Sequence, residues 1–271
     1  MPHPRVSKKP LGQPTRGKTA SNRLRRVDNF LLFYEPSLLT RTDGSFADSI
    51  FVDLGYGFDA RTTLESAARF RCLNPDLKIL GVEIDQERVD NALPFADSKT
   101  FFRLGGFNLP LREGETVRFI RAFNVLRQYE EKEFAPAYEL LAQYVLPDGL
   151  MIEGTSNPFG SIWCANLARK MVNGSWRMEA LVFSTNFRLG FDVQEFQTIL
   201  PKNLIQHVVQ GEPIYDFFEA WKQSAAETAG MKTYGAKQWF VAAAERLAQR
   251  GHEIESQRKW LAKGYLIWKL N

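Results

Sequence analysis

The feature that most constrains the fold is an alternation of short apolar segments with helical repeats between residues 49 and 156. The apolar segments predict strands at 49–54, 78–84, 100–105, 116–124 and 149–155. Between them, apolar residues recur every three or four positions, as they do in amphipathic helices. Successive strands joined by helices run parallel in one sheet and place helices on both of its faces. The pattern therefore predicts a doubly wound α/β sheet.

The C-terminal part of the chain follows a different pattern. Residues 177–186 and 264–270 have strand character, which extends the predicted sheet to seven mostly parallel strands. Between these two segments, aromatic and aliphatic residues fall at helical spacing, which predicts a helical insertion at about 190–255. Three of its aromatic residues could stack on bases, but their spacing favours core packing. These three are Trp221, Trp239 and Phe240.

Charge is unevenly distributed along the chain. No acidic residue precedes Asp28, whereas the rest of the chain is more acidic than basic. We therefore expect two parts, a basic flexible arm with an amphipathic helix at 1–35 and the main domain at 36–271. The arm begins with about 20 residues too poor in apolar side chains to order themselves, and Ser21 is the expected cap of the helix. Such an arm favours RNA as a partner, and a solubilising tail is the alternative.

Other residue types exclude several classes of protein. Cys72 and Cys164 lie far apart, so a disulfide framework or a zinc site is not expected. We expect both thiols to be buried, with Cys164 inside a helix after the fifth strand. His3, His207 and His252 are isolated, which gives no basis for a metal site or a hydrolase triad. Without a long apolar run, no membrane association is expected and the location is predicted to be cytoplasmic.

The first predicted strand runs into a glycine turn and then a helix, in the stretch "FVDLGYGFDARTTLE" at 51–65. A strand, a turn and a helix in this order place unpaired amide groups at the carboxyl edge of the sheet, where an anionic or polar ligand binds. Gly55 and Gly57 would let the backbone approach that ligand closely. The alternative is a turn that uses glycine for geometry alone.

The second predicted strand ends in acidic residues at the same edge. Glu83 could accept hydrogen bonds from both hydroxyls of a ribose, an arrangement that nicotinamide dinucleotides also use. The dinucleotide fingerprint requires a third glycine, however, and "GYGFDA" has Asp59 in that region. The residues therefore favour a nucleoside that carries an amino group, and Asp53 suits a cationic ligand.

Five segments between Ile50 and Ser156 together resemble the motifs of class I S-adenosylmethionine-dependent methyltransferases. They are "VDLGYG", "GVEID", "RLGGFNLP", "FNVLRQY" and "LLAQYVLPDGLMIEGTS", in that order along the chain. The resemblance implies a Rossmann-like fold, S-adenosylmethionine as the cofactor and an enzyme of the EC 2.1.1 class. Methyl transfer in this family needs alignment of the reacting atoms rather than a covalent residue. No metal is implied.

The resemblance also implies roles for individual residues. Asp53, Gly55 and Gly57 would surround the methionine part, Glu83 would bind the ribose, and Phe107 or Asn108 would flank the adenine. Asn124 would orient either cofactor or acceptor and is the candidate catalytic residue, with helix capping as the alternative. Further polar residues on the acceptor side are Arg121, Arg127, Tyr129, Glu153, Thr155, Ser156 and Asn157.

The acceptor itself is not identified by the sequence, with RNA favoured through the basic arm. Two other functions stay open. One is a nicotinamide-dependent oxidoreductase, which shares the sheet. The other is a non-catalytic nucleic-acid-binding module on a methyltransferase scaffold, which Asp59 and the loop "GGFN" would suit. If the arm serves only the partner, removing residues 1–20 is expected to leave cofactor binding unchanged.

Overall fold

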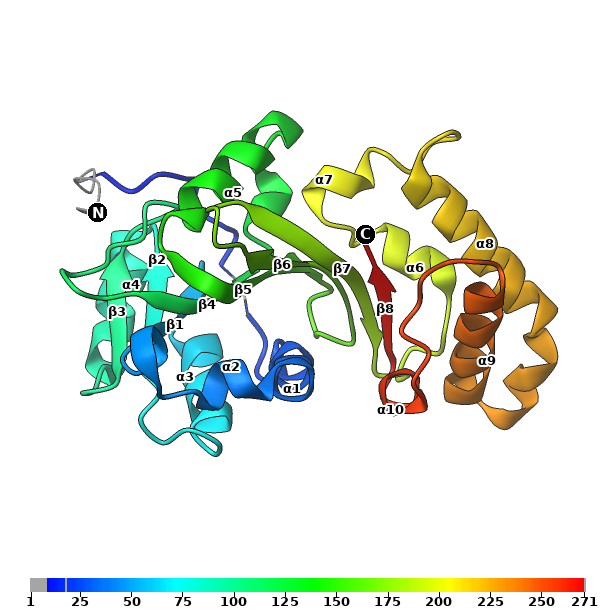
Figure 1. Ribbon diagram of the computed structural model, residues 1–271, viewed down its shortest axis with the longest axis horizontal. Helices are drawn as coiled ribbons and strands as arrows, with labels where there is room; N and C mark the ends of the chain where they lie inside the picture. Colours follow the sequence, from blue (N-terminus) through cyan, green and yellow to red (C-terminus); the bar gives the residue numbers. More distant parts are fainter. Residues whose placement is uncertain (1–8, 18, 271) are drawn as a thin grey trace. The chain divides into compact units, whose positions relative to one another are not determined.

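The computed structural model describes residues 9–17 and 19–270. Its sheet has the strand order β3-β2-β1-β4-β5-β6-β7-β8 (Figure 1). The strands are β1 (Ile50–Leu54), β2 (Ile79–Glu83), β3 (Thr100–Leu104), β4 (Val117–Phe123), β5 (Val145–Ser156), β6 (Ile162–Lys170), β7 (Trp176–Thr185) and β8 (Tyr265–Lys269). The predicted α/β class is confirmed, but the sheet has eight strands rather than seven. The additional strand is β6.

The chain divides into two compact units. Unit 1 contains the residues up to 153 together with 168–177, and unit 2 contains 154–167 together with the residues from 178 onward. The dividing line passes through β5, β6 and β7. The sequence placed its boundary at residue 35 instead, and that division stays a prediction.

The parallel part of the sheet lies in unit 1. Strand β1 pairs in parallel with β2 on one side and β4 on the other, and β2 pairs in parallel with β3. Asp53 lies opposite Gly81 of β2 and Arg121 of β4. The carboxyl ends of these strands therefore meet at one edge. The helices of unit 1 are α1 (Arg25–Tyr34), α2 (Pro36–Thr40), α3 (Arg61–Phe70), α4 (Gln86–Ala92) and α5 (Phe134–Ala142), with short 3-10 turns η1 (Gly44–Phe46), η2 (Leu93–Phe95), η3 (Leu126–Gln128) and η4 (Glu131–Glu133).

Helix starts in unit 1 show which local signals were decisive. The carboxylate of Asp85 accepts from the Arg88 amide at 3.3 Å and caps α4, as the sequence indicates. Ser21 does not cap α1, because its hydroxyl accepts from Arg61 at 3.1 Å and α1 starts at Arg25. Pro36 ends the first helical repeat and also occupies the first turn of α2, where its missing N–H costs nothing.

A buried arginine fixes the segment between α2 and β1. The Arg118 side chain is 1% exposed and donates to the carbonyl oxygens of Leu38, Leu39 and Ser49 at 3.0–3.2 Å. Burial lowers the pKa of Arg118 to about 10. The guanidinium holds the segment by satisfying these buried carbonyls, with Asn74 as a second donor to Leu39 at 2.9 Å.

Unit 2 is built on an aromatic core. Phe183 of β7 contacts the rings of Phe217 and Trp221, with centroids 5.4 Å and 5.2 Å away. Trp221 and Phe240 are fully buried, and the indole N–H of Trp239 donates to a backbone carbonyl. Core packing of the insertion aromatics is therefore confirmed. The helices are α6 (Val193–Gln197), α7 (Lys202–Ile205), α8 (Pro213–Glu227), η5 (Ala229–Tyr234), α9 (Ala236–Gln249) and α10 (Arg258–Leu261).

The two cysteines differ from their expected environments. Cys164 is fully buried, as predicted, but it lies in β6 and not in a helix. Cys72 is exposed, because α3 ends at Phe70 and the thiol follows it in the next turn. The expectation of two buried thiols is therefore wrong for Cys72.

Two absences hold for the described part of the chain. No helix within 9–17 and 19–270 combines the length and the apolar character needed to cross a bilayer. In the same residues, no group of three His, Cys, Asp or Glu side chains converges as metal ligands would. The start of the basic arm, 1–8, lies outside the described residues, as does residue 18.

Candidate functional site

The turn after β1 requires glycine at two positions. Gly55 and Gly57 have φ of 70° and 96°, in the left-handed region that disfavours side chains. A Cβ on Gly55 would lie 2.6 Å from Val125, and one on Gly57 would lie 2.7 Å from the carbonyl oxygen of Gly17. The turn therefore presents bare backbone at the carboxyl edge of the sheet, as the sequence indicates.

Glu83 lies between the glycine turn after β1 and the loop that begins at Gly105 after β3. It ends β2, and its carboxylate is 1% exposed. The carboxylate accepts from the Gly57 amide at 3.0 Å and from the Ile84 amide at 2.9 Å. On the other side, the Gly105 amide donates to the Glu83 carbonyl at 2.9 Å. The parallel pairing of β1 with β2 thus brings the predicted ribose-binding acid next to the predicted glycine turn.

Burial sets the electrostatics of Glu83. It raises the pKa of the carboxyl above its ordinary value, against the opposing effects of the two amides and of Arg88. A guanidinium nitrogen of Arg88 lies 3.5 Å from a Glu83 carboxylate oxygen. An acid held in this way is ready to accept further hydrogen bonds from hydroxyl groups.

Residues 9–17 pass over this edge of the sheet, and we call them the N-terminal strap. The strap pairs with the loop after β3: the Phe107 amide donates to the Leu11 carbonyl at 2.8 Å, and the Leu11 amide donates to the Asn108 side chain at 2.6 Å. The Asn108 amide group donates to the Lys9 carbonyl at 3.0 Å. A Cβ on Gly106 would lie 2.0 Å from the Leu11 carbonyl, so the strap lies directly on bare backbone.

The middle and end of the strap are held by side chains from two other segments and by one backbone amide. The Tyr129 hydroxyl accepts from the Gln13 amide, and Gln128 donates to the Gln13 carbonyl at 2.9 Å. Arg88 donates to the Thr15 carbonyl at 2.8 Å. The Phe58 amide, just after the glycine turn, donates to the Gly17 carbonyl at 2.8 Å. In Figure 1 the dark-blue strap can be followed toward α1.

The strap fills most of the space at the strand ends. The cavity that stays has a volume of about 20 Å³ and is lined by strap residues together with Gly55, Glu83, Phe107 and Tyr129. This is room for about one water molecule, whereas sites for small ligands measure about 300–1,000 Å³. Outside the strap lies a more open groove of about 340 Å³ next to α5, which also includes Gln13 and Tyr129 in its walls.

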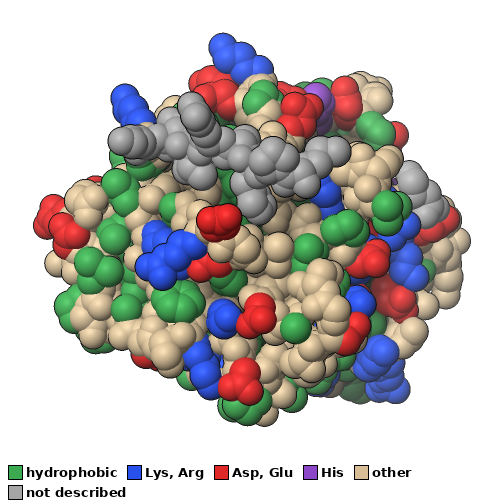
Figure 2. Space-filling view, turned by 60° about the vertical axis from the view of Figure 1, so that its left-hand side comes forward, with side chains coloured by type: hydrophobic (Ala, Val, Ile, Leu, Met, Phe, Trp, Pro, Cys, Tyr) green, Lys and Arg blue, Asp and Glu red, His purple; other side chains and the backbone are tan. Residues whose placement is uncertain are grey.

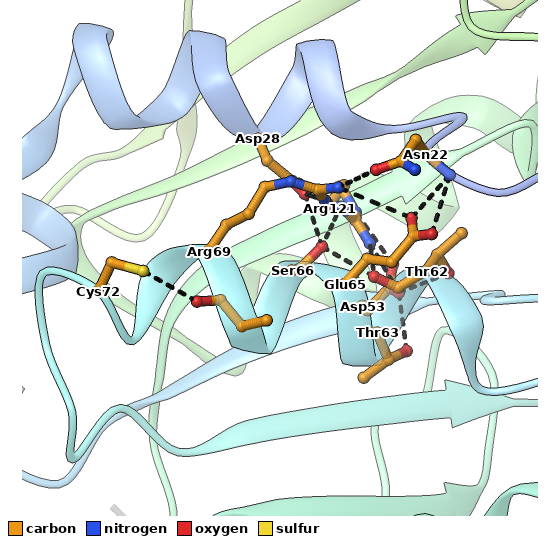
Figure 3. A network of polar contacts seen from close by, with 11 residues as sticks. Asn22, Asp28, Asp53, Thr62, Thr63, Glu65, Ser66, Arg69, Cys72 and Arg121 are labelled. Atoms are coloured by element: carbon orange, nitrogen blue, oxygen red, sulfur yellow. Dashed lines mark hydrogen bonds and ion pairs between the residues drawn. The ribbon is translucent and has the colours of Figure 1, made fainter.

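Asp53 is turned away from this crevice. It is 2% exposed and pairs with Arg121 at 2.8 Å, while the hydroxyls of Thr62 and Thr63 donate to it at 3.0 Å and 2.8 Å. Arg121 also pairs with Asp28 of α1 (Figure 3). Burial alone would lower the pKa of Arg121, but the two acids raise it above its ordinary value. In this conformation the charge of Asp53 is therefore already neutralised.

The structure distributes the remaining predicted residues differently. Asn124 follows β4 with φ of 61°, a backbone conformation that asparagine tolerates better than most residues. Arg121, expected on the acceptor side, is fully buried in the ion network instead. Glu153 is buried and accepts from Tyr138 at 3.3 Å, and Asn157 pairs with Ser161 at 2.6 Å. Thr155 and Ser156 are buried within β5, and Arg127 is exposed.

Surface charge provides no local patch on the face shown in Figure 2. Lys and Arg side chains there are interspersed with Asp and Glu. A polyanion binds where cations cluster, because affinity comes from the release of several counterions together. This face gives no support to RNA binding, and the hypothesis rests on the charge of the arm in the sequence.

Comparisons with known proteins find only distant similarity. No protein-family model matches the sequence, and no curated protein matches it. Among solved structures, the chain is similar to magnesium protoporphyrin IX methyltransferase from Synechocystis PCC 6803 with bound S-adenosylhomocysteine (16% identity, 49% of this chain, 54% of that chain, TM-score 0.36). It is also similar to a putative protein-L-isoaspartate O-methyltransferase from Plasmodium falciparum (14% identity, 58% and 66%, TM-score 0.35).

A third similar structure is described as a pericyclic reaction enzyme (14% identity, 44% of this chain and 30% of that chain, TM-score 0.34). This chain therefore matches less than two thirds of the length of each of these proteins. At such identities and TM-scores the likeness assigns no activity to the chain, and the function must be argued from the residues of the crevice.

Sequence reasoning missed two residues that hold the strap, Arg88 and Gln128. The other side chains that contact it were candidates for other roles, Phe107 and Asn108 for the adenine and Tyr129 for the acceptor side. A signal was nevertheless present, because Gly12 and Gly17 punctuate the arm and both have positive φ in the structure, at 141° and 74°. Glycines at such positions indicate a defined path of the backbone.

Proposed function

We propose that this chain is an S-adenosylmethionine-dependent methyltransferase whose cofactor binds at the carboxyl ends of β1 and β2. The observation that carries the proposal is the Glu83 carboxylate, buried and held beside the positive-φ glycine turn. A carboxylate at this point of a parallel sheet is suited to accept hydrogen bonds from both ribose hydroxyls. The motifs and their order along the chain favour a sulfonium nucleoside over a dinucleotide.

Each predicted residue has a part in this proposal. Gly55 and Gly57 would admit the methionine part close to the backbone, and Phe107 or Asn108 would flank the adenine. Asp53 would act from behind the turn, because its bonds to Thr62 and Thr63 fix the first turn of α3. Asn124 would orient the cofactor or the acceptor.

The cofactor supplies an activated methyl group, and the protein has to align it with the acceptor. A lone pair of the acceptor forms the new bond to carbon as the bond from carbon to sulfur breaks, which leaves S-adenosylhomocysteine. The acceptor is open. RNA held by the arm is our candidate, since the arm combines several cations with almost no apolar residues.

Isothermal titration with S-adenosylhomocysteine tests the proposal. We expect one binding site per chain and no binding of NADH. Transfer of a labelled methyl group from S-adenosylmethionine to cellular RNA, proteins and metabolites would then identify the acceptor. Binding of NADH instead would identify a nicotinamide enzyme. No binding of either compound, by the wild type or by strap variants, would leave a non-catalytic scaffold.

A further inference from the structure

The loop after β3 binds the strap with the groups that a nucleobase would need. Phe107 offers its backbone N–H, and Asn108 offers an amide oxygen and an amide N–H, all of which are engaged by Leu11 and Lys9. An adenine edge presents the matching acceptor and donor, a ring nitrogen and an amino group. The strap and a nucleoside therefore compete for the same hydrogen-bonding groups.

The strap also covers the turn and the acid expected to bind the rest of the cofactor. The Gly17 carbonyl lies where a Cβ on Gly57 would meet it at 2.7 Å, so no ligand can approach that glycine from the same side. Arg88 contacts both Glu83 and Thr15, which links the proposed ribose-binding acid to the strap. The strap thus contacts the glycine turn and the loop after β3 directly, and Glu83 through Arg88.

We propose that the N-terminal strap occupies the crevice in place of the cofactor and must leave it before S-adenosylmethionine can bind. This inference rests on the proposed function. Binding is then limited by the fraction of molecules whose strap is out, since the apparent dissociation constant rises as that fraction falls. The strap is suited to reversible release, because it is held by hydrogen bonds and not by a buried apolar core, and Leu11 is 44% exposed.

Gly17→Val in the full chain weakens the strap. Gly17 has φ of 74°, which a β-branched residue disfavours, and a Cβ would lie 2.8 Å from the Arg88 guanidinium. We expect S-adenosylhomocysteine to bind on the order of 10-fold more tightly to this variant than to the wild type. Gly114→Val is the matched control, because Gly114 also has positive φ, at 81°, but a Cβ there would meet nothing within 4 Å.

Gln128→Ala is a second variant, chosen because Gln128 is exposed and its loss should not affect folding. It removes one hydrogen bond to the strap, and a gain in affinity of about 2- to 10-fold is expected. Gly114→Val should bind like the wild type. Equal affinities in the wild type, Gly17→Val and Gln128→Ala would overturn the inference.

Hydrogen exchange of the full chain separates failure of the strap from failure of the proposed function. We expect the Leu11 and Gln13 amides to be protected in the free protein and to lose protection when S-adenosylhomocysteine is added. If the ligand binds while both amides stay protected, the strap inference is wrong and the cofactor site stands. If no ligand binds to a variant whose Leu11 and Gln13 amides have lost protection, the proposed function is wrong, and the inference falls with it.

Discussion

Two clusters in unit 1 join an acid, an arginine and the N-terminal part of the chain to the sheet. Behind β1, Arg121 pairs with Asp53 and with Asp28 of α1, and all three side chains are almost fully buried. In front of β1, Arg88 contacts Glu83 and the strap residue Thr15. In the rear cluster, the charged groups are paired with one another and with nearby hydroxyls. The front cluster is closed by backbone atoms of a segment that another ligand could replace.

The difference indicates two separate roles for the strap and for α1. Asp28 and its helix are part of the fold, because releasing them would take from the buried Arg121 one of its two acidic partners. The strap, in contrast, can be exchanged for another ligand. Releasing it exposes hydrogen-bonding groups that water or a nucleoside can satisfy. The predicted single arm with its helix therefore contains a structural segment and an exchangeable one.

The largest expected effect is in the rear cluster. Arg121→Leu leaves Asp28 and Asp53 without their common partner and should lower the free energy of unfolding by about 3–5 kcal/mol. Urea unfolding followed by circular dichroism measures it. The control is Lys78→Ala, which breaks an exposed, solvent-screened pair with Asp48 and should change the free energy of unfolding far less. Equal losses of unfolding free energy in the two variants would show that the rear cluster stabilises the fold no more than an exposed ion pair does.

The next effect concerns the front cluster. Glu83→Ala should weaken binding of S-adenosylhomocysteine by about 1–3 kcal/mol through loss of charge-assisted ribose contacts. Titrations in the Gly17→Val background remove the influence of the strap, which Glu83 supports through Arg88. An unchanged affinity in that background would place the ribose elsewhere.

The sequence was sufficient to predict that Gly55, Gly57 and Glu83 meet at one edge of the sheet, but not the contacts of Arg88. Gly55, Gly57 and Glu83 converge because parallel strands end at one edge, a consequence of strand order alone. Asp53 shares that edge in the sequence, but its direction depends on Arg121 and Asp28, which are 93 residues apart. No local pattern carries such a pairing.

The strap and β6 were missed for physical reasons as well. Strap binding uses backbone hydrogen bonds, which leave no periodic trace in a segment rich in Gly and Pro. Strand β6 is buried along nearly all of its length, so apolar and polar residues do not alternate in it. Removing residues 1–20 was expected to leave cofactor binding unchanged, whereas the strap now predicts tighter binding.

A smaller effect is expected from the hydrogen bond between Gln13 of the strap and Tyr129. Tyr129→Phe removes the hydroxyl that accepts from the Gln13 amide and should strengthen binding of S-adenosylhomocysteine by about 0.5–1.5 kcal/mol. Exchange of the Gln13 amide should rise in the same variant before any ligand is added. Faster exchange without a change in affinity would mean that the middle of the strap does not limit access to the crevice.

The smallest effect is the pH dependence of binding. Burial raises the pKa of Glu83, so the carboxyl takes up a proton at a higher pH than an ordinary glutamate does. Only the ionised form accepts from both ribose hydroxyls. Affinity should therefore be full above the raised pKa and fall as the pH drops through it, by at most about 1.4 kcal/mol per pH unit. Titrations of Glu83→Gln, which should bind more weakly than the wild type above that pKa, should lack this acid limb. If the variant keeps the same acid limb, a group other than Glu83 controls binding at low pH.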